Sequence, residues 1–189
     1  QSVGGMTPMD PFSAGNVDTL APGLPGLLVL SSLFPSSVQP MAGLFIRERM
    51  FRLRDRAPLV VVAPQPWFPG QGLIRHFRPG YRPMLPAVEV QQGVSVYFPR
   101  FLALPGLLRR LDGWSMALCT LPLVRRLCHQ HGLRIIDAHF AYPCGQAAVL
   151  LGRWLKRPVS VTLRGTETRH LATPGLGQAA PQAVRQASQ

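Results

Sequence analysis

The chain has 189 residues, 47% of them hydrophobic, and carries 20 Lys and Arg against 8 Asp and Glu, which gives a formal net charge of +12. This length and apolar content suit one domain of ordinary size, and the charge favours anionic partners. The longest apolar runs, at 27–30 and 59–63, are far shorter than the roughly 20 residues that a membrane-spanning helix needs. Residues 1–26 lack the basic start and apolar block of a secretion signal, so we expect a flexible lead-in there.

Three cysteines, Cys119, Cys128 and Cys144, make an odd number without a paired framework. This pattern is typical of unlinked thiols in a reducing compartment, so we expect the cytoplasm. Cys128, His129 and His131 have no second ligand pair at zinc-like spacing, so we expect no metal site.

The excess of arginine has several explanations. The basic residues are scattered and the aromatic residues are not interleaved with them, so nucleic acid is not an expected partner. Phosphorylated small molecules or an anionic membrane surface explain the charge as well. A bias towards arginine with most side chains solvated explains it equally.

The first predicted elements form a strand, a helix and a strand. Leu-Leu-Val-Leu-Ser-Ser follows Gly26 as a mostly apolar run, which is typical of a strand buried on both faces. A helix is predicted over 44–56 and a second apolar strand over 59–63, which together predict a right-handed parallel crossover. The apolar positions that recur at helical spacing are Phe45, Ile46, Met50 and Leu53.

Residues 64–92 are rich in proline, which disfavours a helix or a central strand and predicts a long surface excursion. Its aromatic residues indicate that part of it packs onto the domain; they are Trp67, Phe68, Phe77 and Tyr81. Residues 93–98 then alternate as a third strand, with Val94, Val96 and Phe98 on one face.

The remainder alternates helices and strands. We predict one or two helices over 104–131, a strand over 133–138, a helix over 146–156, a strand over 159–163 and the start of a further helix over 177–189. The predicted buried stripe of the 146–156 helix is Ala147, Leu150, Leu151 and Trp154. Five buried strands separated by helices predict an α/β fold, a Rossmann-like, doubly wound, mostly parallel sheet with its site at the carboxyl ends of the strands.

One such strand ends in titratable residues, Asp137 and His139, before the chain breaks at Pro143. His139 can donate a hydrogen bond or exchange a proton near neutral pH. It can equally be a structural histidine bonded to a loop carbonyl. Asp137 points the same way as His139 only if the strand continues through both residues.

Two other strand ends carry candidate groups. Gly43 opens a predicted helix, where backbone amides can approach an anion, although a glycine there is often only a cap. Arg164 can clamp a phosphate or pair with Glu167. The G-x-G-x-x-G fingerprint and the acidic residue expected after the second strand are absent, as are the G-x-x-x-x-G-K-[ST] loop and the G-x-S-x-G elbow. These absences disfavour nicotinamide-dependent oxidoreductases, nucleotide hydrolases and esterases.

The order of five motifs resembles the amino-terminal half of retaining GT-B glycosyltransferases of family 4. The motifs are Leu-Val-Leu-Ser-Ser-Leu-Phe-Pro, Gly-Leu-Phe-Ile-Arg-Glu-Arg, Val-Val-Ala-Pro-Gln-Pro-Trp-Phe-Pro, Ile-Asp-Ala-His-Phe-Ala-Tyr-Pro and Val-Thr-Leu-Arg-Gly-Thr-Glu. The resemblance implies metal-independent transfer of a hexosyl group from a nucleotide-sugar, a co-substrate rather than a cofactor, to an acceptor hydroxyl in glycan or polysaccharide synthesis. We expect a glycan or a lipid-linked acceptor. The basic surface and the apolar loop residues Trp67 and Phe68 are compatible with a lipid-linked acceptor and with peripheral contact at the inner membrane face.

The resemblance also implies roles for individual residues. His139 matches the histidine near the transferred sugar, and Gly43 matches the loop over the donor phosphates. Thr162 and Gly165 match a turn that lines the cleft, and Arg164 stands where other members often have histidine. The same turn continues through Thr166 and Glu167, which we include among the substrate-binding candidates.

The family's carboxy-terminal donor domain has no counterpart before Gln189, and the chain ends inside a predicted helix and does not begin with Met. We therefore expect residues 27–189 to form an amino-terminal, acceptor-side domain, incomplete at its C-terminus and inactive as this fragment. The alternative is a non-catalytic α/β module for an anionic ligand. A nucleic-acid-binding protein, supported only by charge, is less favoured.

Overall fold

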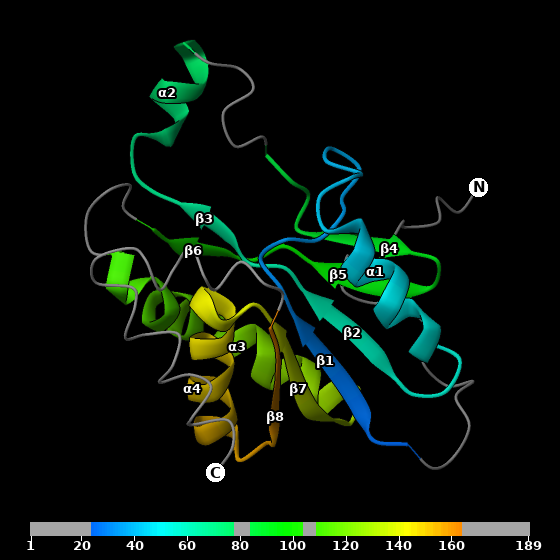
Figure 1. The fold of residues 1–189 in the computed structure, drawn as a ribbon. Coiled ribbons are helices and arrows are strands. Elements are labelled where there is room, and N and C mark those ends of the chain that lie inside the picture. Colours follow the sequence, from blue (N-terminus) through cyan, green and yellow to red (C-terminus); the bar gives the residue numbers. More distant parts are fainter. Residues whose placement is uncertain (1–23, 78–83, 104–108, 164–189) are drawn as a thin grey trace, which may run out of the picture.

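The computed structural model describes residues 24–77, 84–103 and 109–163. Its centre is a six-stranded sheet in the order β4-β5-β2-β1-β7-β8 (Figure 1). The strands are β1 (Gly26–Leu30), β2 (Leu59–Val62), β4 (Val88–Gln91), β5 (Val94–Tyr97), β7 (Leu133–His139) and β8 (Val159–Thr162). Every neighbouring pair is parallel except β4 and β5, which pair antiparallel. The predicted α/β, Rossmann-like, doubly wound and mostly parallel sheet is confirmed.

Helices cover both faces of the sheet, with α1 on one face and α3 and α4 on the other (Figure 1). They are α1 (Leu44–Met50), continued by the 3-10 turn η1 (Phe51–Leu53), α3 (Asp112–Gln130), preceded by η2 (Arg109–Leu111), and α4 (Gln146–Leu155). Side chains alternate between the two faces along a strand. Val29 therefore packs with Ile46 of α1, whereas Leu28 and Leu30 pack against α3 and α4.

The stretch at 64–92 is more regular than its prolines predict. β3 (Gln65–Trp67) pairs in parallel with β6 (Arg100–Leu102) in a separate two-stranded sheet, and α2 (Gln71–Phe77) follows. The expectation that this stretch contains no helix is wrong because of α2, whereas β3 is not a central strand and agrees with the expectation. Both strands of a two-stranded sheet are edge strands, and an edge strand tolerates a proline because that residue need not donate a backbone hydrogen bond. The backbone N–H of Gln65 donates to the Pro99 carbonyl instead.

The antiparallel strand β4 is likewise missing from the sequence-based prediction. It is joined to β5 by Gln92 and Gly93, whose φ angles are +50° and +83°. Positive φ at both central residues is the signature of the two-residue turn that matches the twist of a hairpin. The Gln-Gly pair between two Val-containing runs was the available signal.

Three residues assigned to buried stripes are exposed: Phe45 at 48%, Leu53 at 40% and Trp154 at 39%. α1 is a seven-residue helix that ends in a 3-10 turn at Leu53, so among its own residues only Ile46 and Met50 are buried. The Trp154 ring instead lies 6.1 Å from the ring of Trp114. The fifth predicted strand, β8, is an edge strand and only partly buried.

Of the remaining predictions, one is confirmed and several concern residues outside the described ranges. Val94, Val96 and Phe98 share one core, as the alternation predicts. Residues 1–23, Tyr81, the start of the helix predicted at 104 and the tail at 177–189 lie outside the described ranges. Within those ranges, no helix is both long and apolar enough to cross a membrane.

The loop of residues 31–43 between β1 and α1, here called the β1–α1 loop, is held onto β4. The Ser37 amide donates to both carboxylate oxygens of Glu89, at 3.0 and 3.2 Å, and the Ser37 hydroxyl donates to Oε1 at 2.6 Å. Gln91 Nε2 donates to the Pro35 carbonyl at 2.9 Å and to Glu89 at 3.0 Å. Partial burial alone raises the pKa of Glu89, but the hydrogen bonds from Ser37 and Gln91 outweigh burial and hold the pKa below its usual value.

The far end of the β1–α1 loop is closed by Gly43. Its φ is +67°, a conformation that glycine adopts without strain. A Cβ at this position would overlap the carbonyl oxygen of Leu33 and would lie 2.8 Å from its carbonyl carbon. The loop therefore folds back on its own start, and only glycine allows the approach.

We expect Gly43→Ala to lower the free energy of unfolding more than Gly132→Ala does. Both glycines have positive φ, at +67° and +60°, so each substitution adds backbone strain of about 1–2 kcal/mol. Only at Gly43 does the new methyl group meet backbone atoms, since no described atom lies within 4 Å of it at Gly132. Urea unfolding of both variants measures the difference, and equal losses would contradict the close approach of Leu33.

We expect Glu89→Gln to lower the free energy of unfolding by about 1 kcal/mol at pH 7, a small loss because solvent screens the site. Folding lowers the pKa of Glu89 below its ordinary value of 4.5, so the carboxylate stabilises the fold above that pH. This stabilisation disappears as the pH falls through the folded pKa. The difference in thermal unfolding between wild type and variant should therefore shrink as the pH falls below 4.5.

The matched control is Glu48→Gln, because Glu48 is 59% exposed and pairs with its neighbour Arg47. This variant should differ less from wild type at pH 7. A loss in Glu89→Gln that stays constant from pH 7 to pH 3 would show that the charge of Glu89 does not hold the loop.

Candidate functional site

Asp137 and His139 lie at the carboxyl end of β7. Ile136 and Ala138 belong to the core beneath α3 and α4, so Asp137 and His139 face the opposite side of the sheet. The strand continues through both residues, which is the condition for their side chains to point the same way. Asp137 Oδ2 lies 3.4 Å from His139 Nε2.

This pair is enclosed by the protein. The His139 side chain is fully buried and Asp137 is 8% exposed. The 3.4 Å separation is longer than a typical N–H···O hydrogen bond, so the contact orients the ring without a short bond. His139 can touch a substrate only when the residues that enclose it move.

Thr162 lies beside His139 on the neighbouring strand. The two residues are paired in the β7–β8 register, as are Asp137 and Ser160. Val159 and Val161 pack against the α3 and α4 core, so Thr162 lies on the same face as His139. The other four candidates from this strand end, Arg164, Gly165, Thr166 and Glu167, lie outside the described residues.

The segments that follow β1 and β7 meet at Cys144. The Ser32 amide donates to the Cys144 Sγ at 3.2 Å, and the thiol donates to the Ser32 Oγ at 3.4 Å. Burial raises the pKa of the Cys144 thiol, against the Ser32 hydrogen bonds that lower it. A protonated, buried thiol is a poor nucleophile, so Cys144 links the two segments. This link was not predicted from the sequence, although Cys144 directly follows Pro143 beyond the end of the strand.

Gly43 lies at the other end of the β1–α1 loop, against Leu33. Its positive φ and this contact account for a glycine here without any ligand. Through Ser32 and Cys144, the loop that carries Gly43 is joined to the segment after His139. His139 and Thr162 are thus brought together directly, and Gly43 belongs to a loop that contacts their neighbourhood.

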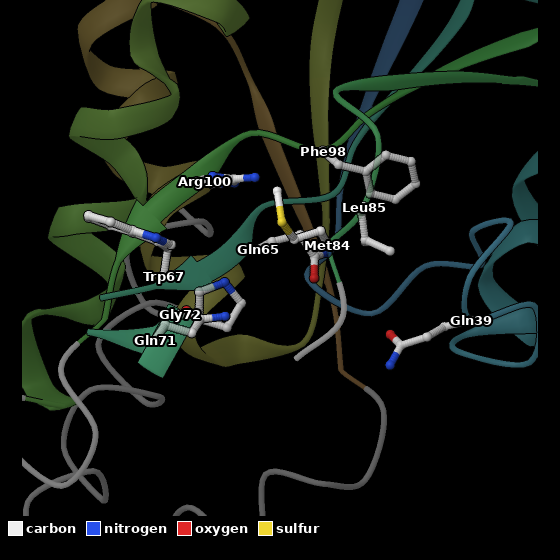
Figure 2. A pocket seen from close by; sticks show the side chains of 10 residues that line it. Gln39, Gln65, Trp67, Gln71, Gly72, Met84, Leu85, Phe98 and Arg100 are labelled. Atoms are coloured by element: carbon white, nitrogen blue, oxygen red, sulfur yellow. The ribbon is translucent and has the colours of Figure 1, made fainter. Parts of the chain in front are cut away.

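A pocket of about 240 Å³ opens where β2 and β5 run on into β3 and β6. Its polar lining is Gln39, Gln65, Gln71 and Arg100, and its apolar lining includes Trp67 and Leu85 (Figure 2). This pocket was not predicted from the sequence, because residues 64–92 were expected to form a long surface excursion rather than the walls of a site. The available signal was the cluster of glutamines and Trp67 in that stretch.

The cysteine and histidines at the end of α3 show no metal-binding arrangement. Burial raises the pKa of Cys128, although Arg157 counteracts it, and burial lowers the pKa of His131. Over the described ranges, no three or more His, Cys, Asp or Glu side chains form a group that could hold a metal ion.

No protein-family model matches the chain. In sequence it is similar to a protein of Bacillus subtilis (strain 168) named "Putative teichuronic acid biosynthesis glycosyltransferase TuaC", with 29% identity over 147 residues. The matched region covers 75% of this chain and 36% of TuaC, so the chain spans little more than a third of the relative's length.

Proposed function

We propose that this chain is the acceptor-side part of a glycosyltransferase that moves a sugar from a nucleotide-sugar to an acceptor hydroxyl in glycan or polysaccharide synthesis. The observation that carries the proposal is the 29% identity with TuaC over 75% of the chain. The sheet supports it, because open α/β sheets bind ligands at the carboxyl ends of their strands. Asp137, His139 and Thr162 lie at such ends.

The order of the sequence motifs supports a finer assignment, the amino-terminal half of a retaining, metal-independent GT-B enzyme of family 4. In that arrangement a second domain holds the nucleotide-sugar and faces this one. The match to 36% of TuaC is consistent with such a division of labour. Transfer would then require both domains, and this half alone would bind acceptor without turning over.

Roles for the site residues follow from the charges that develop during transfer. Positive charge builds on the anomeric carbon in an oxocarbenium-like transition state, and negative charge builds on the departing phosphate. Groups placed in advance at those charges stabilise the transition state. We assign His139 to a hydrogen bond with the transferred sugar, Thr162 to the wall of the cleft and Gly43 to the approach of the donor phosphates. By the same resemblance we assign substrate binding to Arg164, Gly165, Thr166 and Glu167, which lie outside the described residues.

The location of α2 supports contact with a lipid-linked acceptor. This helix projects from the sheet (Figure 1) and exposes Leu73, Ile74 and Phe77 at 66%, 37% and 75%. Apolar side chains on a projecting helix, combined with a net charge of +12, suit the surface of an anionic membrane. We propose peripheral contact at the cytoplasmic face.

A second candidate function is a non-catalytic module for an anionic ligand. The pocket beside β3 and β6 supports it, because Arg100 lines this cavity and no carboxylate does so among the residues that the structure describes. Sugar transfer by the protein expressed from its complete reading frame separates the two, since a pure binding module would bind ligand without any transfer.

We expect His139→Ala to lower the rate of sugar transfer about 100-fold or more, because a positioned proton donor or acceptor contributes a factor of this size. Asp137→Asn should lower the rate less, since it leaves the imidazole in place and removes only its orienting charge. Transfer from a nucleotide-sugar to an acceptor, measured in the complete protein, checks both variants. Circular dichroism confirms that the sheet is retained.

The matched control is His129→Ala, because His129 is exposed at the end of α3. It should leave transfer unchanged. Wild-type transfer by His139→Ala would remove His139 from the catalytic site, and an equal loss in the His129 variant would point to a general effect of losing a histidine.

A further inference from the structure

The pocket beside the two-stranded sheet is built from several elements. β3 contributes Gln65 and Trp67, α2 contributes Gln71, and β6 contributes Arg100. Gln39 of the β1–α1 loop lies on the side opposite Trp67 and Gln71 (Figure 2). A cavity closed from both sides in this way is a property of the fold rather than a dent in one loop.

Gln71 is buried with an unused acceptor. Its side chain is only 4% exposed, and its Oε1 has no hydrogen-bond partner among the described residues. A buried polar atom without a partner costs free energy. Gln71 lines the pocket, so a turn of its carboxamide towards the cavity lets a ligand hydroxyl donate to Oε1 and recover that free energy. The pocket therefore favours ligands that carry donors.

Two further amides make the lining suitable for hydroxyl groups. Gln65 Nε2 donates to the Ala63 carbonyl at 3.0 Å, which fixes the orientation of this side chain. Gln39 lines the other side. A carboxamide offers both donors and an acceptor, so three of them match a ring whose hydroxyls both donate and accept hydrogen bonds.

Arg100 adds a charge that no described residue of the pocket neutralises. Among the residues that the structure describes, no Asp or Glu lines the cavity, and none forms an ion pair with Arg100. A guanidinium holds a carboxylate or a phosphate by paired hydrogen bonds. The electrostatics therefore favour a ligand with one negative group.

Size and apolar surface narrow the ligand further. A cavity of about 240 Å³ is smaller than the roughly 300–1,000 Å³ of sites for drug-sized molecules, so it suits one sugar ring and not a whole nucleotide-sugar. The Trp67 ring is 39% exposed, and its flat apolar face suits the C–H face of a pyranose. A single sugar ring with hydroxyls, an apolar face and one negative group matches the carboxamides, Trp67 and Arg100 of the lining.

We propose that this pocket binds an anionic sugar residue of the acceptor, a pyranose ring that carries a carboxylate or a phosphate. Arg100 pairs with the negative group, Gln71 and Gln65 bond ring hydroxyls, and Trp67 packs on the ring. The acceptor role rests on the proposed sugar transfer, whereas the binding of an anionic sugar rests on the pocket alone.

Titration of the 189-residue chain with four probes tests the pocket, with binding followed by NMR chemical shifts or calorimetry. The probes are methyl β-glucuronide, glucose 6-phosphate, methyl β-glucoside and inorganic phosphate. We expect at least one anionic sugar to bind about tenfold or more tightly than the neutral glucoside and than inorganic phosphate. Tight binding of the glucuronide identifies a carboxylate as the partner of Arg100, and tight binding of glucose 6-phosphate identifies a phosphate.

Variants assign the binding to named residues. Arg100→Gln should weaken the anionic sugar about tenfold and leave the neutral glucoside unchanged, and Arg100→Lys should retain part of the affinity. Arg153→Gln is the matched control, because Arg153 is exposed on α4 and its loss changes the net charge equally. Gln71→Leu should weaken charged and neutral sugars alike. Thermal unfolding verifies that each variant is folded.

Three results would overturn the proposal: neither anionic sugar binds more tightly than the neutral glucoside, neither binds more tightly than inorganic phosphate, or the Arg100 and Arg153 variants have equal effects. Absence of binding by every probe would overturn it as well. Anionic-sugar binding in a complete protein that transfers no sugar would uphold the pocket and refute the transfer. Sugar transfer that is insensitive to Arg100→Gln would uphold the transfer and refute the pocket as the acceptor site.

Discussion

β1 pairs in parallel with β2 on one side and with β7 on the other, and helices cover both faces of the sheet around it. Because parallel strands run in one direction, the segments that leave β1, β2 and β7 all emerge at the same edge of the sheet. The alternation of Leu28 and Val29 between the two cores locks the register, since a slip by one residue would move every side chain to the opposite face. The same slip in β7 would drive Asp137 and His139 into the core beneath α3 and α4. Apolar packing therefore decides where the polar groups lie.

Strands could be predicted from the sequence wherever burial on both faces of the sheet requires a continuous run of apolar residues. The runs at 27–30, 59–63 and 133–138 became β1, β2 and β7 for this reason, and they place His139 correctly at a strand end. Strand β3 within 64–92 was not predicted, because proline is excluded from central strands, whereas β3 is an edge strand that needs few backbone hydrogen bonds. The predicted burial of Trp154 was wrong because helical spacing identifies which face of the helix is apolar, but not how far along the helix the sheet covers that face. The pocket was not predicted for the same reason, since β3, α2 and β6, which line it, were not predicted.

The Asp137 and His139 pair is the costliest feature of the sheet. Asp137 is 8% exposed and His139 is 0% exposed, and Asp137 occupies the position that Val29 fills on β1 and Val61 on β2. Removing such polar groups from water is unfavourable unless they contact each other. Cys144 shows the contrasting case nearby, because its thiol is buried at little cost and its bonds to Ser32 tie two segments together. Stability alone would be served by apolar residues at 137 and 139. The retention of a carboxylate and an imidazole there is the strongest structural reason to treat this strand end as a site.

The β1–α1 loop connects this strand end to the pocket. Ser32, near its start, bonds Cys144 behind β7, whereas Gln39, near its end, lines the pocket beyond β2 and β5. Between these points Ser37 is bonded to Glu89 on β4, and Gly43 closes the loop against Leu33. A ligand in the pocket that contacts Gln39 therefore acts on the same short segment that packs beside the His139 strand end. Because the loop is anchored at both ends and in its middle, we expect such a ligand to select among few loop conformations, and so to influence the His139 strand end through this segment.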